Sequence, residues 1–168
     1  MTENRDLTNL EVLSIAIKSE IDAQRLYTRM KEKVDAEDLH EKLDFLIAQE
    51  EKHEKILREV YENKFPEVEL ALPPKAIVPM IDDVLSKDAT LKELFEAGMQ
   101  AEKMAGEFYT GLADKTNDMR SKRTLLYMAN MEESHYAILV AEWNQIERMK
   151  TEEASDFLDS EGLMHFGP

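Results

Sequence analysis

The chain has 168 residues, enough for one well-cored domain. Its formal charge of −15 and its pI near 4.7 argue against a nucleic-acid or anionic-membrane partner, because both would repel such a surface. The absence of cysteine excludes disulfides, Cys-ligated zinc or iron–sulfur sites and a thiol nucleophile. The first residues lack the pattern of a signal peptide, and no apolar run approaches membrane-spanning length. We therefore expect a soluble, cytoplasmic protein.

The first half of the sequence predicts two long helices. Residues 8–11 form a capping-box pattern, and apolar residues then recur at helical spacing as far as Met30. The polar segment 35–38 predicts a turn into a second helix, whose inward stripe extends to Val60. These two helices would form a hairpin.

The second half predicts a crossover followed by another hairpin. The prolines between residues 66 and 74 cannot continue the second helix, and a shorter helix is expected over residues 76–85. A second capping-box pattern at residues 90–93 begins the third long helix, and a turn at residues 117–118 leads into the fourth. The helical pattern lapses near Lys150. We therefore expect a bundle domain over residues 1–150 and a short C-terminal tail over residues 151–168.

An internal repeat relates the two predicted hairpins. Glu50-x-x-His53 recurs as Glu132-x-x-His135, with each residue 82 positions later. The same offset, without a gap, aligns further residues: Thr8 with Thr90, Glu20 with Glu102, Ala23 with Ala105, Tyr27 with Tyr109, and Phe45 with Tyr127. Two such hairpins would pack as an all-α four-helix bundle with approximate two-fold symmetry.

Six residues on the apolar helix faces form a candidate di-metal site. They are Glu20, Glu50, His53, Glu102, Glu132 and His135. Residues i and i+3 are neighbours on a helix surface, so each Glu-x-x-His pair can offer oxygen and nitrogen to one metal ion. Four buried carboxylates would repel one another, whereas two divalent cations would balance them. Mixed oxygen and nitrogen donors suit iron, manganese or zinc.

Two tyrosines accompany this set. Tyr27 and Tyr109 each lie seven residues after a candidate ligand, Glu20 and Glu102, on the same helix face. We interpret their hydroxyls as hydrogen-bond donors that orient the carboxylates. The alternative is that they are interior tyrosines with a polar end.

These motifs resemble the di-iron domain of rubrerythrins, within the ferritin-like superfamily. The resemblance spans roughly residues 8–149. It rests on Glu20-x-x-Ala23-x-x-x-Tyr27, Glu50-x-x-His53, Glu102-x-x-Ala105-x-x-x-Tyr109 and Glu132-x-x-His135. It implies a ferritin-like bundle that binds two iron ions, with manganese or zinc as alternatives, in which Glu50 and Glu132 bridge the metals and Glu20 and Glu102 are terminal ligands.

The resemblance also implies an activity, the reduction of hydrogen peroxide to water in oxidative stress, with dioxygen as the alternative oxidant. The catalytic set would comprise the six ligands together with Tyr27 and Tyr109. Typical rubrerythrins have a Cys-ligated rubredoxin module, which a chain without cysteine lacks. We therefore expect an external electron donor, rubredoxin-like or a flavoprotein, and a homodimer. Many rubrerythrins also carry a further Glu where this sequence has Ala105, so the set is similar to bacterioferritin-type centres.

Two other functions remain open from the sequence. The acidic composition favours an iron-handling protein, a ferritin-like ferroxidase that oxidises Fe(II) and stores it or passes it on. The third possibility is a structural, non-redox metal site, with zinc as a candidate ion.

Overall fold

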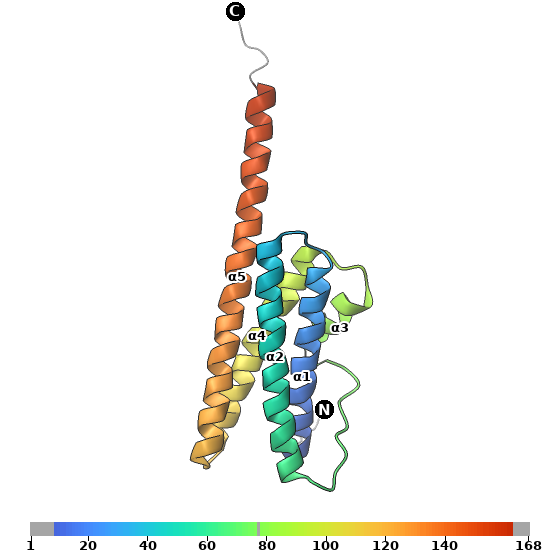
Figure 1. Cartoon of the computed structure of the whole chain (residues 1–168), viewed down its shortest axis with the longest axis vertical. Coiled ribbons are helices and arrows are strands. Elements are labelled where there is room, and N and C mark those ends of the chain that lie inside the picture. The colour runs from blue at the N-terminus through green and yellow to red at the C-terminus, as the bar shows by residue number, and fades with distance from the viewer. Residues whose placement is uncertain (1–8, 77, 163–168) are drawn as a thin grey trace, which may run out of the picture.

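The computed structural model describes residues 9–76 and 78–162, with side chains through residue 153. In these residues, the regular secondary structure is helical (Figure 1). The five helices are α1 (Asn9–Lys31), α2 (Glu37–Lys64), α3 (Pro79–Ser86), α4 (Leu91–Lys115) and α5 (Met119–Gly162). Among these residues, no helix is both long and apolar enough to span a membrane. The predicted all-α class is confirmed.

The four long helices form two hairpins. α1 packs mainly on α2, α4 packs mainly on α5, and the hairpins meet chiefly through α1 and α4, whereas α2 and α5 have few contacts. A long connection from Phe65, which includes α3, joins the hairpins (Figure 1). The predicted bundle of two hairpins and a crossover is therefore confirmed.

The apolar core is divided into two clusters, one on each side of a polar layer. One cluster contains Leu26, Leu43, Phe95 and Leu139, and the other contains Ile17, Leu57, Tyr109 and Met128. In every long helix, the candidate ligands fall between the residues of the two clusters. The helix pattern therefore places a layer of charged residues in the middle of the bundle, with apolar side chains above and below it.

The start of α4 follows the predicted capping box. The backbone N–H of Glu93 donates to Thr90 Oγ1 at 3.3 Å, and the backbone N–H of Thr90 donates to Glu93 Oε2 at 2.8 Å. Two N–H groups that have no partner within the helix are thereby satisfied. The matching cap expected at Thr8 lies outside the described residues.

The short crossover helix begins later than predicted. The sequence suggested residues 76–85, but α3 starts at Pro79. Proline suits the first turn, where a missing N–H costs no helical hydrogen bond, and it disfavours helix in the residue before it. Ala76 instead remains in the loop, where its N–H donates to Asp82 Oδ2 at 2.9 Å and ties the loop to α3.

The last helix is longer than predicted. The helical pattern was expected to lapse near Lys150, but α5 continues to Gly162 and projects beyond the bundle (Figure 1). Residues 151–161 contain neither glycine nor proline, so no backbone feature ends the helix before Gly162. Residues 163–168 of the expected tail lie outside the described part.

The cap of α4 yields a stability prediction. Thr90→Ala should lower the free energy of unfolding by about 1 kcal/mol, because the N–H of Glu93 loses its acceptor. Urea denaturation followed by circular dichroism measures this change. Thr110→Ala, at an exposed position inside the same helix, is the matched control and should be neutral or slightly stabilising. Equal effects of the two substitutions would contradict the cap.

Candidate metal centre

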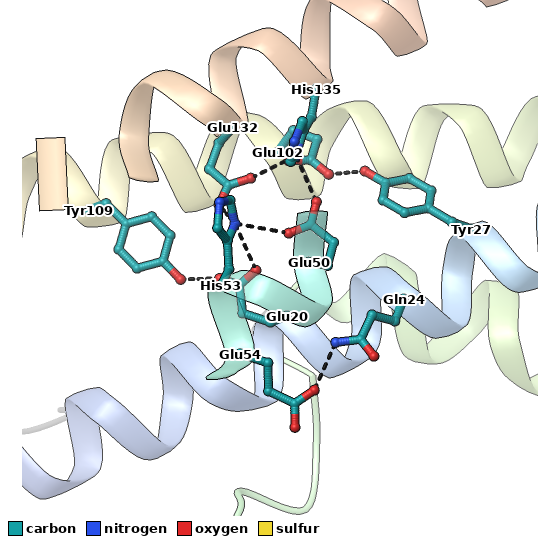
Figure 2. Close-up of polar contacts among 10 residues, drawn as sticks. All are labelled: Glu20, Gln24, Tyr27, Glu50, His53, Glu54, Glu102, Tyr109, Glu132 and His135. Atoms are coloured by element: carbon teal, nitrogen blue, oxygen red, sulfur yellow. Dashed lines mark hydrogen bonds and ion pairs between the residues drawn. The ribbon is translucent and has the colours of Figure 1, made fainter. Parts of the chain in front are cut away.

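The six candidate ligands converge in the middle of the bundle (Figure 2). α1 supplies Glu20, α2 supplies Glu50 and His53, α4 supplies Glu102, and α5 supplies Glu132 and His135. Each of the six residues is at most 2% exposed. Because ionisable groups are rarely buried without compensation, this layer requires a counter-charge.

The six residues form two groups that share two carboxylates. One group is Glu20, Glu50, His53 and Glu132, and the other is Glu50, Glu102, Glu132 and His135. Within each group, one donor atom from every residue lies within 4.8 Å of the others. Glu50 and Glu132 belong to both groups, which is the placement that bridging carboxylates require.

The imidazoles direct the same nitrogen atom into the cluster. His53 Nδ1 lies 3.1 Å from Glu132 Oε1 and 3.2 Å from Glu50 Oε2. His135 Nδ1 lies 2.7 Å from Glu50 Oε1 and 3.2 Å from Glu132 Oε2. The two rings face each other with centroids 5.7 Å apart. The centre thus has the approximate two-fold symmetry of the repeat.

Several of these buried atoms have no well-directed hydrogen bond. They include both oxygens of Glu50, Glu132 Oε1, and both ring nitrogens of His53 and His135. Buried polar atoms in proteins nearly always have partners. Unpartnered oxygen and nitrogen donors that converge on two points fit a pair of metal ions with mixed ligation. The residues present therefore fit the di-metal site that the motif predicts.

The two tyrosines link the hairpins across the centre. The Tyr27 hydroxyl on α1 donates to Glu102 Oε1 on α4, and the Tyr109 hydroxyl on α4 donates to Glu20 Oε1 on α1. The expected hydrogen bonds to carboxylates are confirmed. Each tyrosine thus holds a carboxylate of the opposite hairpin, so the two hairpins fix each other's candidate ligands.

Without metal, the pKa values of the clustered carboxylates and imidazoles are shifted in different directions. Burial raises the pKa values of Glu20 and Glu102 well above the usual range. Burial opposes ionisation of Glu50 too, but the contacts with His135 and His53 outweigh it and lower the pKa of Glu50 to about 2. Burial alone would lower the pKa values of His53 and His135, yet the surrounding carboxylates raise both to about 12. Protons thus compensate the charge when no metal does so.

The remaining histidines and neighbouring glutamates stay outside the centre. Glu51 and Glu133, each adjacent to a candidate ligand, are exposed, as expected. His40 Nε2 contacts the Val34 carbonyl at 2.7 Å, far from the cluster in sequence and structure. His165, to which no role was given, lies outside the described residues.

A polar pair beside the centre was not predicted from the sequence. Gln24 Nε2 on α1 donates to Glu54 Oε2 on α2 at 2.8 Å (Figure 2). The signal was present in the spacing, since these residues lie four positions after Glu20 and Glu50, one turn along the same helices.

Comparison with known proteins agrees with this geometry. The sequence profile of the family described as Rubrerythrin matches residues 11–142. The chain belongs to the rubrerythrin family. This family lies within the ferritin-like superfamily, and the 168 residues contain no cysteine with which to build a rubredoxin module. The buried carboxylate and histidine cluster, together with the family, is compatible with a di-iron site.

Two solved structures are similar to this rubrerythrin-family protein. A protein titled "Hypothetical Protein Pfu-1136390-001 From Pyrococcus furiosus" is 32% identical, with 88% of this chain and 95% of that chain covered and a TM-score of 0.74. A structure titled "CopM in the Cu(I)-bound form" is 13% identical, with 83% and 97% covered and a TM-score of 0.66, and this likeness shows the fold alone. No curated protein has a significant sequence match to the chain.

The tyrosine bonds yield a prediction for metal affinity. Tyr27→Phe and Tyr109→Phe should each weaken metal binding by about tenfold or more, because a terminal carboxylate loses the donor that orients it. Competition with a chromophoric chelator measures the affinity. Tyr61→Phe is the matched control, because this buried hydroxyl donates to the Glu69 carbonyl at 3.3 Å, away from the cluster. Unchanged affinity in both tyrosine variants would contradict the orienting role.

The pKa values yield a prediction for pH dependence. Glu20, Glu102, His53 and His135 all have raised pKa values, and the two histidines, with pKa values of about 12, hold protons at neutral pH in the metal-free protein. Metal must displace these protons, so binding should release them, and affinity should fall as the pH falls because protons compete more strongly. A pH indicator in weakly buffered solution measures the release during titration with Zn(II). Binding without proton release would contradict this charge assignment.

Proposed function

We propose that this protein is a di-iron oxidoreductase that reduces hydrogen peroxide or dioxygen with electrons from an external donor. The observation that supports it best is the pair of buried donor groups that share Glu50 and Glu132. The family gives independent support, since the rubrerythrin profile covers both Glu-x-x-His motifs.

Each residue has a separate role in this proposal. Glu50 and Glu132 would bridge two metal ions, while one ion takes Glu20 and His53 and the other takes Glu102 and His135. The four carboxylates would balance two divalent cations, and the His Nδ1 atoms complete a mixed donor set that suits iron, with manganese or zinc also possible. Tyr27 and Tyr109 position Glu102 and Glu20 through their hydroxyls.

Two ferrous ions, when bound, would supply the two electrons that convert one hydrogen peroxide and two protons to two waters. The chain contributes the environment of that reaction. The apolar clusters above and below the polar layer exclude bulk water from it. The tyrosine hydroxyls keep the terminal carboxylates fixed while charge changes at the centre.

The proposal also covers the electron donor, the oligomeric state and the cellular compartment. Without a cysteine-ligated module in these residues, electrons would come from a separate rubredoxin-like protein or flavoprotein. We also propose a cytoplasmic homodimer with a role in oxidative stress.

An iron-handling function, as a ferritin-like ferroxidase, is the second candidate. It is favoured by the acidic surface, with a formal charge of −15 for the whole chain, which attracts cations. Sizing with metal analysis separates the two functions. A small oligomer that stops at two irons per chain supports the oxidoreductase, whereas a large assembly that accumulates many irons supports storage.

The direct test is anaerobic reconstitution with Fe(II), followed by peroxide in a stopped-flow instrument. We expect near-ultraviolet ferric absorbance to develop rapidly, with one peroxide consumed for every two irons. A protein that binds iron but shows no accelerated oxidation would contradict the redox function and favour a structural metal site, with zinc as a candidate ion.

The ligand assignment has its own test. Glu50→Ala combined with Glu132→Ala should abolish metal binding, because each bound ion loses both shared carboxylates. Inductively coupled plasma analysis of the purified variant measures the bound metal. Glu51→Ala combined with Glu133→Ala removes the exposed neighbours and should leave two metals per chain. Metal retained in the first double variant would overturn the assignment.

A further inference from the structure

The two halves of the centre have matching ligands but different surroundings. Gln24 and Glu54 lie four residues after Glu20 and Glu50. At the equivalent positions of the second hairpin, 82 residues later, the chain has Gly106 and Tyr136. The α1–α2 edge of the centre therefore carries an amide and a carboxylate, whereas the α4–α5 edge carries neither.

The polar pair on the α1–α2 edge lies between solvent and the buried ligands. Glu54 follows His53 directly in α2, and its side chain is 19% exposed. Its carboxylate accepts from Gln24 Nε2 at 2.8 Å and from Arg58 Nε at 2.6 Å. Figure 2 shows this pair beside Glu20, at the border of the cluster. Solvent thus reaches the Glu54 carboxylate, whereas the neighbouring candidate ligand Glu20 is buried.

The surface outside this edge favours cations. A shallow groove of about 430 Å³ runs along the outer face of α2. It is lined by four carboxylates and two basic side chains, Glu51, Glu54, Glu59, Glu62, Lys55 and Arg58. The excess of negative charge raises the local concentration of cations next to Glu54.

The opposite edge has only ordinary packing contacts. A side-chain carbon at Gly106 would lie 3.6 Å from the Ala129 carbonyl oxygen and 3.6 Å from Glu132 Cβ, which is van der Waals contact between α4 and α5. At these two positions that edge offers no carboxylate that could receive a cation. On the α1–α2 edge, the Glu54 carboxylate is held only by side chains, Gln24 and Arg58, and side chains rotate much faster than packed helices move.

We propose that divalent metal reaches the centre across the α1–α2 edge, where Glu54 accepts the incoming cation in place of the Gln24 amide and transfers it to Glu20 and His53. This inference rests on the proposed metal centre. His53 Nδ1 lies 3.5 Å from Glu20 Oε2, and Figure 2 shows the pair beside Glu20, so the two receiving ligands stand together next to it. The His135 half is filled second, through the shared carboxylates Glu50 and Glu132.

The test uses Co(II), whose visible absorbance reports ligation, mixed with metal-free full-length protein in a stopped-flow instrument. Glu54→Gln should slow association by about tenfold. The new side-chain amide oxygen can still accept from Gln24, but it carries no negative charge to attract a cation. The final stoichiometry and the equilibrium affinity should remain those of the wild type. Gln24→Ala should instead speed both association and dissociation, since it removes the side chain that closes the edge.

The matched control is Glu51→Gln, which removes the same charge from the same groove without touching Gln24. It should change the association rate less than twofold, on the scale expected for one exposed charge. Equal slowing by Glu51→Gln and Glu54→Gln, or wild-type rates in both Glu54→Gln and Gln24→Ala, would overturn the access route while leaving the centre intact. Failure of the wild-type protein to bind Co(II) at all would overturn the centre and the route together.

Discussion

The structure depends on the charge buried in the middle of the bundle. Four carboxylates and two imidazoles, all nearly inaccessible to solvent, lie between two apolar clusters. Such a layer would oppose folding unless positive charge accompanied it, either as protons or as metal. The raised pKa values of the histidines indicate compensation by protons, and the donor atoms without hydrogen-bond partners fit compensation by metal. The remainder of the fold holds these groups in register.

The repeat produces the symmetry of the centre, and the crossover and nearby side chains break it. Tyr27 donates to Glu102 of the other hairpin, and Tyr109 donates to Glu20 in return. These two carboxylates are therefore held equivalently. One turn further along the helices, the repeat has diverged, with Gln24 bonded to Glu54 on one edge and Gly106 and Tyr136 at the equivalent positions on the other. A duplicated ligand set in unequal surroundings allows the two metal positions to differ in accessibility without differing in ligand chemistry.

Much of this arrangement was predictable because helical spacing is a local property. The capping box at Thr90 and the Glu-x-x-His motifs each follow from residues within one turn. Two predicted helix boundaries were wrong, because the apolar pattern does not include backbone constraints. α3 begins only at Pro79, and α5 continues beyond Lys150. Alignment in the repeat does not by itself indicate burial, because Phe45 and Tyr127 align with each other yet are 47% and 55% exposed. Periodicity identifies a helix face, but the packing of neighbouring helices decides how much of it is covered.

The sequence by itself determined the helical class, the two hairpins and the identity of the six clustered residues, because a gap-free repeat with ligand spacing depends only on position along a helix. Only the tertiary structure decided which tyrosine serves which hairpin and which side chains meet at the α1–α2 edge. These features join residues from different helices, as with Tyr27 and Glu102, which are 75 positions apart. The distance between such residues is set by how the helices pack, and no spacing within one helix contains that information.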